Sequence, residues 1–409
     1  MMAEDVFELN SWVGRVQSSK QGPKKNITNL MLHLRNIPHL GPKLAFNDLT
    51  GNIEWHGREL KDSDYVDIRM LMEAPPFNFE ANARDVPAAV MRTAEDNTIN
   101  PVVDYLEGLK WDGKPRISNW LQNIFDADDT EINRAFGRMF LIAAVARALQ
   151  PGCKVDTMLI AKGLQGIGKT SAFQALFGEE FVTGSITSLK GAETAQALQG
   201  VWAVDLGELE ALNTSVNAVK NFLTLQRDRY RPPWGKHFIW RPRRMVFTGT
   251  TNEDAFLSDA TGARRFWPFE GRRVDLSTLK RARDQLWAEA VRAFKDGEKW
   301  WIENGSELDS LAQAAQQDSY KEDIWAPRID QFLNSVETRN RGCVTLSEVA
   351  AYLCISSERQ DAKIEERIIA HMKMRDWWKR RCMRHGQNLN WWFPPETQEE
   401  FKLGRPRGA

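Results

Sequence analysis

The chain has 409 residues, of which 42% are hydrophobic and 27% charged, a composition typical of a globular protein with two or three domains. Its 55 basic and 55 acidic residues cancel, so any binding of a polyanion must come from local clusters. Four cysteines without a CxxC pair argue against a zinc ribbon or a disulfide framework, and no stretch approaches the ~20 apolar residues of a membrane span. The first residues also lack the basic segment and the apolar segment of a signal peptide. Together these features predict a soluble, cytoplasmic protein without a membrane partner.

The first 150 residues are predicted to form two regions. Residues 1–95 mix short alternating runs with turn signals, which predicts a small α/β or strand-rich accessory region. Residues 96–150 are predicted to be a helical preface, because apolar side chains recur at helical spacing around Trp120 and again over 135–149. The preface should end at the helix breaker Pro151.

A glycine-rich loop follows at residues 163–170, with the sequence G-L-Q-G-I-G-K-T. An apolar run precedes it and a helical pattern follows it, and this context predicts a loop whose backbone N–H groups face the phosphates of a nucleotide. Lys169 is expected to reach the β and γ phosphates of ATP, and the Thr170 hydroxyl to bind Mg²⁺. The residues expected to hold the nucleotide are Gly163, Gly166, Ile167, Gly168, Lys169, Thr170 and Ser171.

Residues 151–304 are predicted to form an α/β core of the P-loop NTPase class with a parallel sheet. Strand-like runs alternate there with helical patterns, and a helix with one apolar face follows from Leu279 to Phe294. The five expected strands cover 155–161, 181–183, 201–206, 244–250 and 265–270.

Polar residues at the ends of these strands are candidates for catalysis, since hydrolysis needs a carboxylate at the end of a neighbouring strand. The third strand ends in acids, and we assign Glu208 as the catalytic carboxylate and Asp205 as its magnesium-side partner. Spacing alone leaves their order open, and surface acids are the plainer alternative. Asn252 either positions the attacking water or closes a strand through an Asx turn. Arg264 and Arg265 either edge the last strand in solvent or stabilise the transferring phosphoryl group in trans.

Basic residues gather between the third and fourth strands. Residues 220–244 contain eight Lys or Arg and one acid, a net 8 − 1 = +7 in a neutral chain. The turn residues of 231–238 predict a hairpin near whose tip Lys236 and His237 project. With Arg231, they are expected to contact DNA phosphates without reading bases. The alternative is that these arginines pair with acids of a neighbouring subunit.

The last hundred residues are predicted to hold a connector and a small domain. Residues 305–320 are polar and rich in glutamine, as in a connector, and 321–409 should form a C-terminal helical domain. Residues 389–393 suit a β-wing, which would make the domain a winged-helix DNA binder. The alternative is an amphipathic helix that packs against the rest of the protein. The basic residues expected to contact DNA there are Lys379, Arg380 and Arg381.

The order of these motifs resembles the virulence-associated protein E family, whose members are phage, prophage and pathogenicity-island ATPases similar to superfamily 3 replicative helicases. The resemblance spans roughly residues 100–270 and includes matches at 151–170, 202–210, 228–235, 249–252 and 264–268.

This resemblance implies an AAA+ ring, usually hexameric, with ATP at subunit interfaces and single-stranded DNA in the central channel. Many relatives carry an N-terminal primase, but residues 1–95 are short for one and show no suitable carboxylate pair, so no primase activity is expected. The matched positions are Lys169 and Thr170 in Walker A, Asp205 and Glu208 in Walker B, Asn252 as sensor, Arg265 and then Arg264 as arginine finger, and Lys236 and His237 on a pore hairpin.

The sequence therefore predicts an ATP- and Mg²⁺-dependent, ring-forming DNA helicase or translocase. We expect it to act in phage or mobile-element replication in the bacterial cytoplasm, on single-stranded or forked DNA and with a phage or host replication partner. The alternative is a defence or regulatory NTPase switch that engages a protein. A GTPase would need an N-K-x-D motif, which the sequence lacks.

Overall fold

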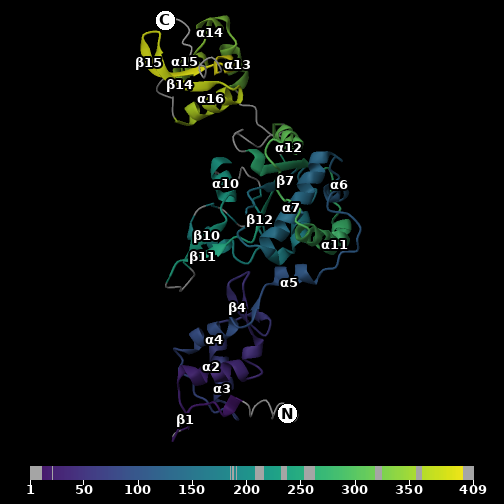
Figure 1. Ribbon diagram of the computed structural model, residues 1–409, viewed down its shortest axis with the longest axis vertical. Helices are drawn as coiled ribbons and strands as arrows, with labels where there is room; N and C mark the ends of the chain where they lie inside the picture. The colour runs from purple at the N-terminus through teal and green to yellow at the C-terminus, as the bar shows by residue number, and fades with distance from the viewer. Residues whose placement is uncertain are drawn as a thin grey trace.

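The computed structural model arranges the chain as three units that follow one another along its long axis (Figure 1). We call them the N-terminal, central and C-terminal units. The structure describes residues 12–20, 22–184, 186, 188–189, 191–207, 216–231, 237–252, 263–317, 325–355 and 362–398. No helix in these ranges is both long and apolar enough to cross a lipid bilayer.

The N-terminal unit is a small α/β fold, as the sequence predicts for this region. Its four-stranded sheet has the order β5-β4-β3-β6, with β3 antiparallel to β4 and parallel to β6. Helices α2 and α4 pack together beside β3, and their apolar side chains form one buried cluster with those of the sheet. The elements are β1 Ser18–Ser19, β2 Gly22–Pro23, α2 Ile27–Asn36, β3 Leu44–Asn47, β4 Asn52–Trp55, β5 Arg58–Glu59, α3 Asp64–Glu73, α4 Val86–Ala94 and β6 Thr98–Ile99.

The helical preface forms as expected, in three helices: α5 Pro101–Gly108, α6 Trp120–Phe125 and α7 Glu131–Leu149. The Thr130 side chain caps α7 by accepting a hydrogen bond from the Asn133 N–H, which satisfies an N–H group that the helix itself leaves unpaired. Gly137 lets α7 approach α6 closely, because a Cβ at this position would lie 2.7 Å from the Trp120 indole nitrogen. Helix α6 therefore packs closely against α7 and helps to bury it.

The sheet of the central unit has five parallel strands in the order β13-β7-β12-β9-β8, all close to the predicted ranges. Both faces are covered. Leu159 and Ala161 of β7 pack with α7, α8 and α11, while Met158 and Ile160 face the opposite side, toward α10. A strand buried on both faces consists of consecutive apolar residues, which explains why β7 could be recognised in the sequence. The elements are β7 Met158–Lys162, α8 Lys169–Phe177, β8 Val182–Thr183, α9 Ala192–Ala197, β9 Ala203–Asp205, α10 Val216–Leu223, β12 Val246–Thr251, β13 Phe266–Glu270 and α11 Leu276–Lys295.

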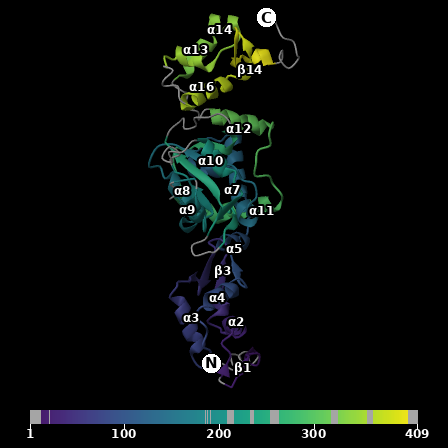
Figure 2. The same cartoon turned by 90° about the vertical axis from the view of Figure 1, so that its left-hand side faces the viewer.

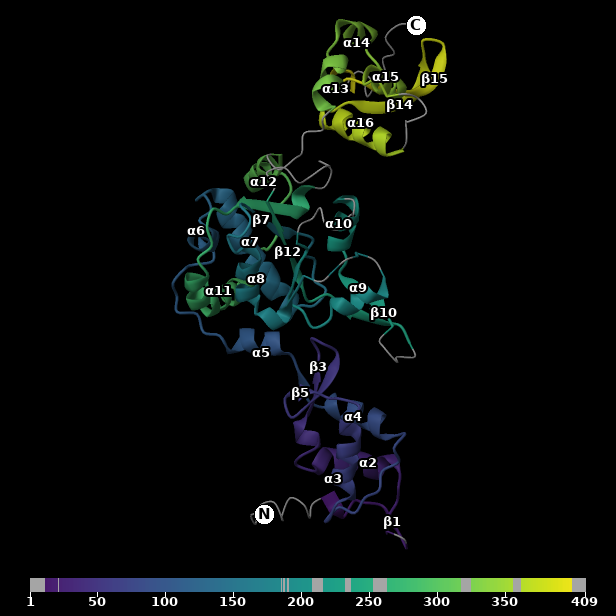
Figure 3. The ribbon, with the colours of Figure 1, turned by 180° about the vertical axis from the view of Figure 1, so that it is seen from behind.

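Two further elements complete the central unit. A two-stranded antiparallel ribbon, β10 Arg227–Tyr230 with β11 Ile239–Pro242, projects from the side away from α6 and α11 (Figure 3). The segment expected to be a connector contains helix α12 Glu307–Gln317, which lies between the central sheet and the C-terminal unit (Figure 2). Ala312 is buried there and the Gln316 amide donates to the Phe266 carbonyl at 3.0 Å. A few buried contacts are enough to hold a helix whose composition is mostly polar.

The C-terminal unit contains short helices followed by a β-hairpin. Strands β14 and β15 pair antiparallel through a two-residue turn, His385-Gly386, in which both residues have positive φ. The wing expected at 389–393 is thus part of β15, whereas an amphipathic helix through the basic stretch is excluded because α16 ends at Met374. The elements are α13 Ala326–Leu333, α14 Val336–Arg341, α15 Leu346–Tyr352, α16 Ala362–Met374, β14 Trp378–Arg384 and β15 Gln387–Phe393.

Candidate functional site

The glycine-rich loop joins the end of β7 to the start of α8. Gly163, Gly166 and Gly168 all have positive φ, a backbone region that other residues enter only with strain. At Gly163 there is also no space for a side chain, because a Cβ would meet the Gly271 carbonyl oxygen at 2.2 Å. The Gly163 N–H donates to the Thr251 carbonyl at 3.2 Å, which ties the loop to the end of β12.

Lys169 is the first residue of α8, and its side chain turns back into the loop. Only 7% of the residue is exposed. Its Nζ donates to the carbonyl oxygens of Gly163 at 2.6 Å and Leu164 at 2.9 Å, and to Oδ1 of Asn252 at 3.0 Å. The structure therefore brings together two side chains that are 83 positions apart and that the sequence assigned to one site.

Asp205 ends β9 at the same edge of the sheet. It is 4% exposed, and its carboxylate accepts hydrogen bonds from the Thr170 hydroxyl and, at 3.1 Å, from the Gly207 N–H. Burial raises the pKa of Asp205, and these hydrogen bonds oppose the rise. Strand β9 is not a direct neighbour of β7, because β12 lies between them, and Asn252 directly follows β12. Glu208, the other acid of the motif, lies outside the described residues.

The two candidate arginines lie at the amino ends of the strands, whereas the glycine-rich loop lies at their carboxyl ends. They immediately precede β13, which runs parallel to β7 with Phe266 opposite Met158. The five residues of β7 therefore separate them from the loop, roughly 16 Å at ~3.3 Å per residue. Arg264 donates to the Asn304 Oδ1 at 3.3 Å. The Nε of Arg265 lies 4.0 Å from the Oδ2 of Asp156. Both line a cleft of about 650 Å³ beside α12. Neither arginine is placed to reach Lys169 of its own chain.

The basic stretch forms the hairpin that the sequence predicts, but part of its charge is neutralised inside the chain. Arg243 is fully buried and forms two hydrogen bonds with Asp228, at 2.8 and 2.9 Å. Lys220 is also buried. The exposed positive charge is accordingly smaller than the +7 counted along the sequence. Arg231 and His237 are exposed, whereas Lys236 lies outside the described residues.

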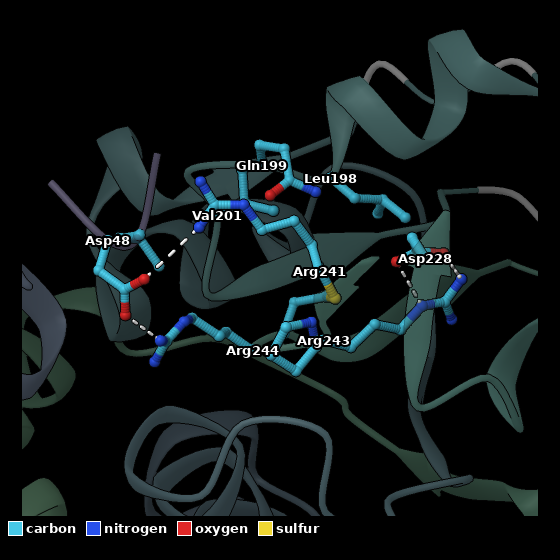
Figure 4. A pocket seen from close by; sticks show the side chains of 11 residues that line it. Asp48, Leu198, Gln199, Val201, Asp228, Arg241, Arg243 and Arg244 are labelled. Atoms are coloured by element: carbon cyan, nitrogen blue, oxygen red, sulfur yellow. Dashed lines mark hydrogen bonds and ion pairs between the residues drawn. The ribbon is translucent and has the colours of Figure 1, made fainter. Parts of the chain in front are cut away.

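Two more of these cations pair with the N-terminal unit (Figure 4). Asp48 lies between the guanidinium groups of Arg241, at 3.4 Å, and Arg244. Gly51 approaches Arg241 so closely that a Cβ would lie 2.5 Å from its Nη2. Burial lowers the pKa of Arg244, and the Asp48 carboxylate opposes this change. Arg241 and Arg244 thus find an acid in another unit of the same chain.

The basic residues of the C-terminal unit lie on β14. Lys379, Arg380 and Arg381 are all exposed, and because side chains alternate along a strand, Arg380 faces the opposite way from the other two. They belong to a different unit from the glycine-rich loop (Figure 1). Their contact with DNA stays a prediction.

Sequence reasoning missed several residues that shape this region. Asp48 gave no local signal, because its partners are 193 and 196 positions away. Phe238 and Trp240 were not among the predicted site residues, yet both are exposed. The alternation of residue types along 227–230 and 238–241 is the signal that indicates which side chains share a face.

The fold and the site define an α/β protein whose parallel sheet presents a glycine-rich loop, a buried lysine and a buried carboxylate at one edge. Residues 106–321 match the model of the virulence-associated protein E-like domain, which is more than half of the 409 residues. The chain belongs to this family.

Similar solved structures include three apo structures of the C-terminal region of NrS-1, two of them in an A form. They share 14–15% sequence identity with this chain, with TM-scores of 0.41, 0.45 and 0.46. The matches cover 86% of this chain and 95–96% of those chains. No curated protein matches the sequence.

Proposed function

We propose that this protein is an ATP-dependent, ring-forming DNA helicase or translocase of the superfamily 3 type that acts in the replication of a phage or mobile element. One observation supports this function above others. Lys169, the hydrogen-bonded pair of Thr170 and Asp205, and Asn252 converge at the carboxyl edge of a parallel sheet, around a glycine-rich loop. These are the chemical groups that phosphoryl transfer from a nucleotide requires.

The residues present fit MgATP. The loop N–H groups and the Lys169 ammonium are suited to bind the phosphates, because both are donors held in place before binding. The Thr170 hydroxyl and the Asp205 carboxylate already share a hydrogen bond, and both are oxygen ligands of the kind that Mg²⁺ prefers. Bound Mg²⁺ would neutralise charge on the phosphates. Asn252 would position the attacking water, and Glu208 would accept its proton.

The distance between the two edges of the sheet supports a shared site. Arg265 is separated from its own loop by the length of β7, so it can stabilise a transferring phosphoryl group only on another subunit. An interface in which one subunit supplies the loop and the next supplies the arginine is heterologous, and it generates a ring when the rotation between subunits closes. The β10–β11 ribbon would then contact the DNA.

The first test is the substitution Lys169→Ala. We expect the rate of ATP hydrolysis to fall at least about 100-fold, because a preorganised cation for the phosphates is lost. The circular dichroism spectrum should not change, since the lysine contacts loop carbonyls and not the apolar core. Lys295→Ala, an exposed lysine at the end of α11, is the matched control and should hydrolyse ATP at the wild-type rate. Undiminished turnover in the Lys169 variant would remove the nucleotide site.

A mixing experiment tests whether the site is shared. Lys169→Ala and Arg265→Ala should each be inactive alone, the latter by about 10³-fold. Mixed in equal amounts and allowed to exchange subunits, they should regain activity, because about a quarter of the boundaries combine an intact loop with an intact arginine. A mixture that stays as inactive as its components would show that no such boundary exists.

A further inference from the structure

The outer face of the β10–β11 ribbon carries an alternation of arginines and exposed aromatic rings. Asp228 and Tyr230 point inward and are buried, so Arg227 and Arg229 point outward on the same strand. On the facing strand Trp240 is 54% exposed, and Phe238, directly before that strand, is 62% exposed. Large aromatic side chains grouped on a surface mark a binding site more often than chance packing does.

The arginines and rings are stacked on one another. The Arg227 Cζ lies 4.4 Å from the centre of the Trp240 ring, and the Arg229 Cζ lies 5.0 Å from that of Phe238 and 5.7 Å from that of Trp240. Cross-strand pairing places Arg229 directly opposite Trp240. Arg229 therefore lies near both rings, and Arg227 lies against Trp240 alone.

The ribbon is firmly attached to the central unit from its inner face. Arg243 binds Asp228 and also donates to the Phe222 carbonyl at 2.6 Å, while Arg241 is paired with Asp48. Arg227 and Arg229, in contrast, have no carboxylate within ion-pair distance in the described part of the chain. The charges on the inner face thus attach the ribbon to the rest of the protein. The positive charge on the outer face remains available for an anionic ligand.

We propose that this outer face, made of Arg227, Arg229, Phe238 and Trp240, is a platform on which the bases of a single nucleic acid strand stack. The rings supply flat apolar faces that accept any base, and the guanidinium groups supply positive charge for the phosphates. A duplex does not fit this chemistry, because its bases are already stacked on each other. The inference rests on the proposed function for its DNA partner and adds base contact to a ribbon expected to touch only phosphates.

The test is equilibrium binding of a fluorescently labelled thymidine 30-mer, without nucleotide, to wild-type protein and to the Phe238→Ala/Trp240→Ala variant. Each lost stack should weaken binding about tenfold, so the double variant should bind about a hundredfold more weakly. Trp240→Phe should retain most of the affinity because it keeps a ring. Trp111→Ala, a partly exposed tryptophan outside the ribbon, should bind like the wild type.

A strand of equal length and charge built of abasic sites separates stacking from phosphate contact. The wild-type protein should bind it about as weakly as the double variant binds either strand. Stacking is refuted if the double variant binds thymidine strands like the wild type, or if it loses affinity for both strands equally. It is also refuted if the variant changes only the sedimentation coefficient, since the face would then contact a second copy of the chain.

These outcomes are distinct from a failure of the proposed function. If the double variant keeps wild-type affinity while DNA still stimulates ATP hydrolysis, only the stacking platform is wrong. If the wild-type protein binds no strand even at low salt, the DNA partner itself is wrong, and the ribbon has no such ligand.

Discussion

At the scale of single residues, the buried carboxylate of Asp205 lowers the stability of the folded protein at neutral pH. Its carboxylate is almost completely buried, and burial raises its pKa above the ordinary value. The folded protein therefore holds this proton more tightly than the unfolded chain does. The resulting stability is complete below the ordinary aspartate pKa and is lost as the pH rises through the raised value. At neutral pH, keeping the carboxylate charged and buried therefore costs stability.

The substitution Asp205→Asn should make this cost visible. The amide oxygen can still accept a hydrogen bond from the Gly207 N–H, but no charge is buried. We expect a higher melting temperature than the wild type at pH 7, a difference that shrinks as the pH falls toward the ordinary aspartate pKa of about 4. Mg²⁺-dependent ATP hydrolysis should be lost at the same time. Melting curves that respond identically to pH would show that Asp205 is not the source of the effect.

At the scale of elements, the β10–β11 ribbon depends on one buried ion pair. An isolated two-stranded ribbon is marginal in water, so it needs attachment to a larger core. Arg243, whose side chain is completely buried, supplies this by binding both carboxylate oxygens of Asp228. Breaking such a pair from one side leaves a buried charge without its counterpart.

We therefore expect Asp228→Asn to lower the free energy of unfolding by about 3–5 kcal/mol, measured by urea denaturation. Asp296→Asn is the matched control. Asp296 pairs with Arg292 on the exposed face of α11, where a salt bridge contributes about 0.5 kcal/mol or less. Equal losses in the two variants would contradict the anchoring role of the buried pair.

At the scale of the whole molecule, the N-terminal unit is joined to the central unit by more than the chain itself. Leu49 is buried in the core of the central unit, and its carbonyl accepts a hydrogen bond from the Gly200 N–H at 3.0 Å. Beside it, Asp48 pairs with Arg241, which is part of β11, and with Arg244, two residues after the end of β11 (Figure 4). The turn between β3 and β4 thus connects the N-terminal unit to the base of the ribbon.

The substitution Asp48→Asn should loosen this connection. Asp48 is 32% exposed and its arginines are more deeply buried, so we expect a loss of about 1–2 kcal/mol, between the values for surface and fully buried pairs. Calorimetry should then show the N-terminal unit unfolding at a lower temperature than the central unit. Asp62→Asn, an exposed acid in the same unit, should leave the thermogram unchanged. A single unaltered transition for the Asp48 variant would show that the two units are coupled by Leu49 and its surroundings alone.

Much of the architecture could be predicted because it has local causes. Strands β7, β9, β12 and β13 are short runs of mostly buried residues, and the loop between β7 and α8 needs glycine where φ is positive, so both features appear within a few residues of sequence. The sequence also placed Lys169, Thr170, Asp205 and Asn252 in one site, and the structure brings these four together. The Gln-rich segment of α12 was not recognised, because its helix depends on contacts with distant residues and not on its own pattern.

What the sequence determined by itself is therefore the positions of the sheet strands along the chain, the glycine-rich loop and the family to which the chain belongs. Only the tertiary structure decided which charges remain available. Arg241, Arg243 and Arg244 look the same in the sequence as Arg227 and Arg229, yet the first three are neutralised by Asp48 and Asp228 while the last two lie against exposed rings. The reason is physical: a charge or a ring acquires its role from the groups that folding brings within a few ångströms, and those groups lie up to 196 positions away along the chain.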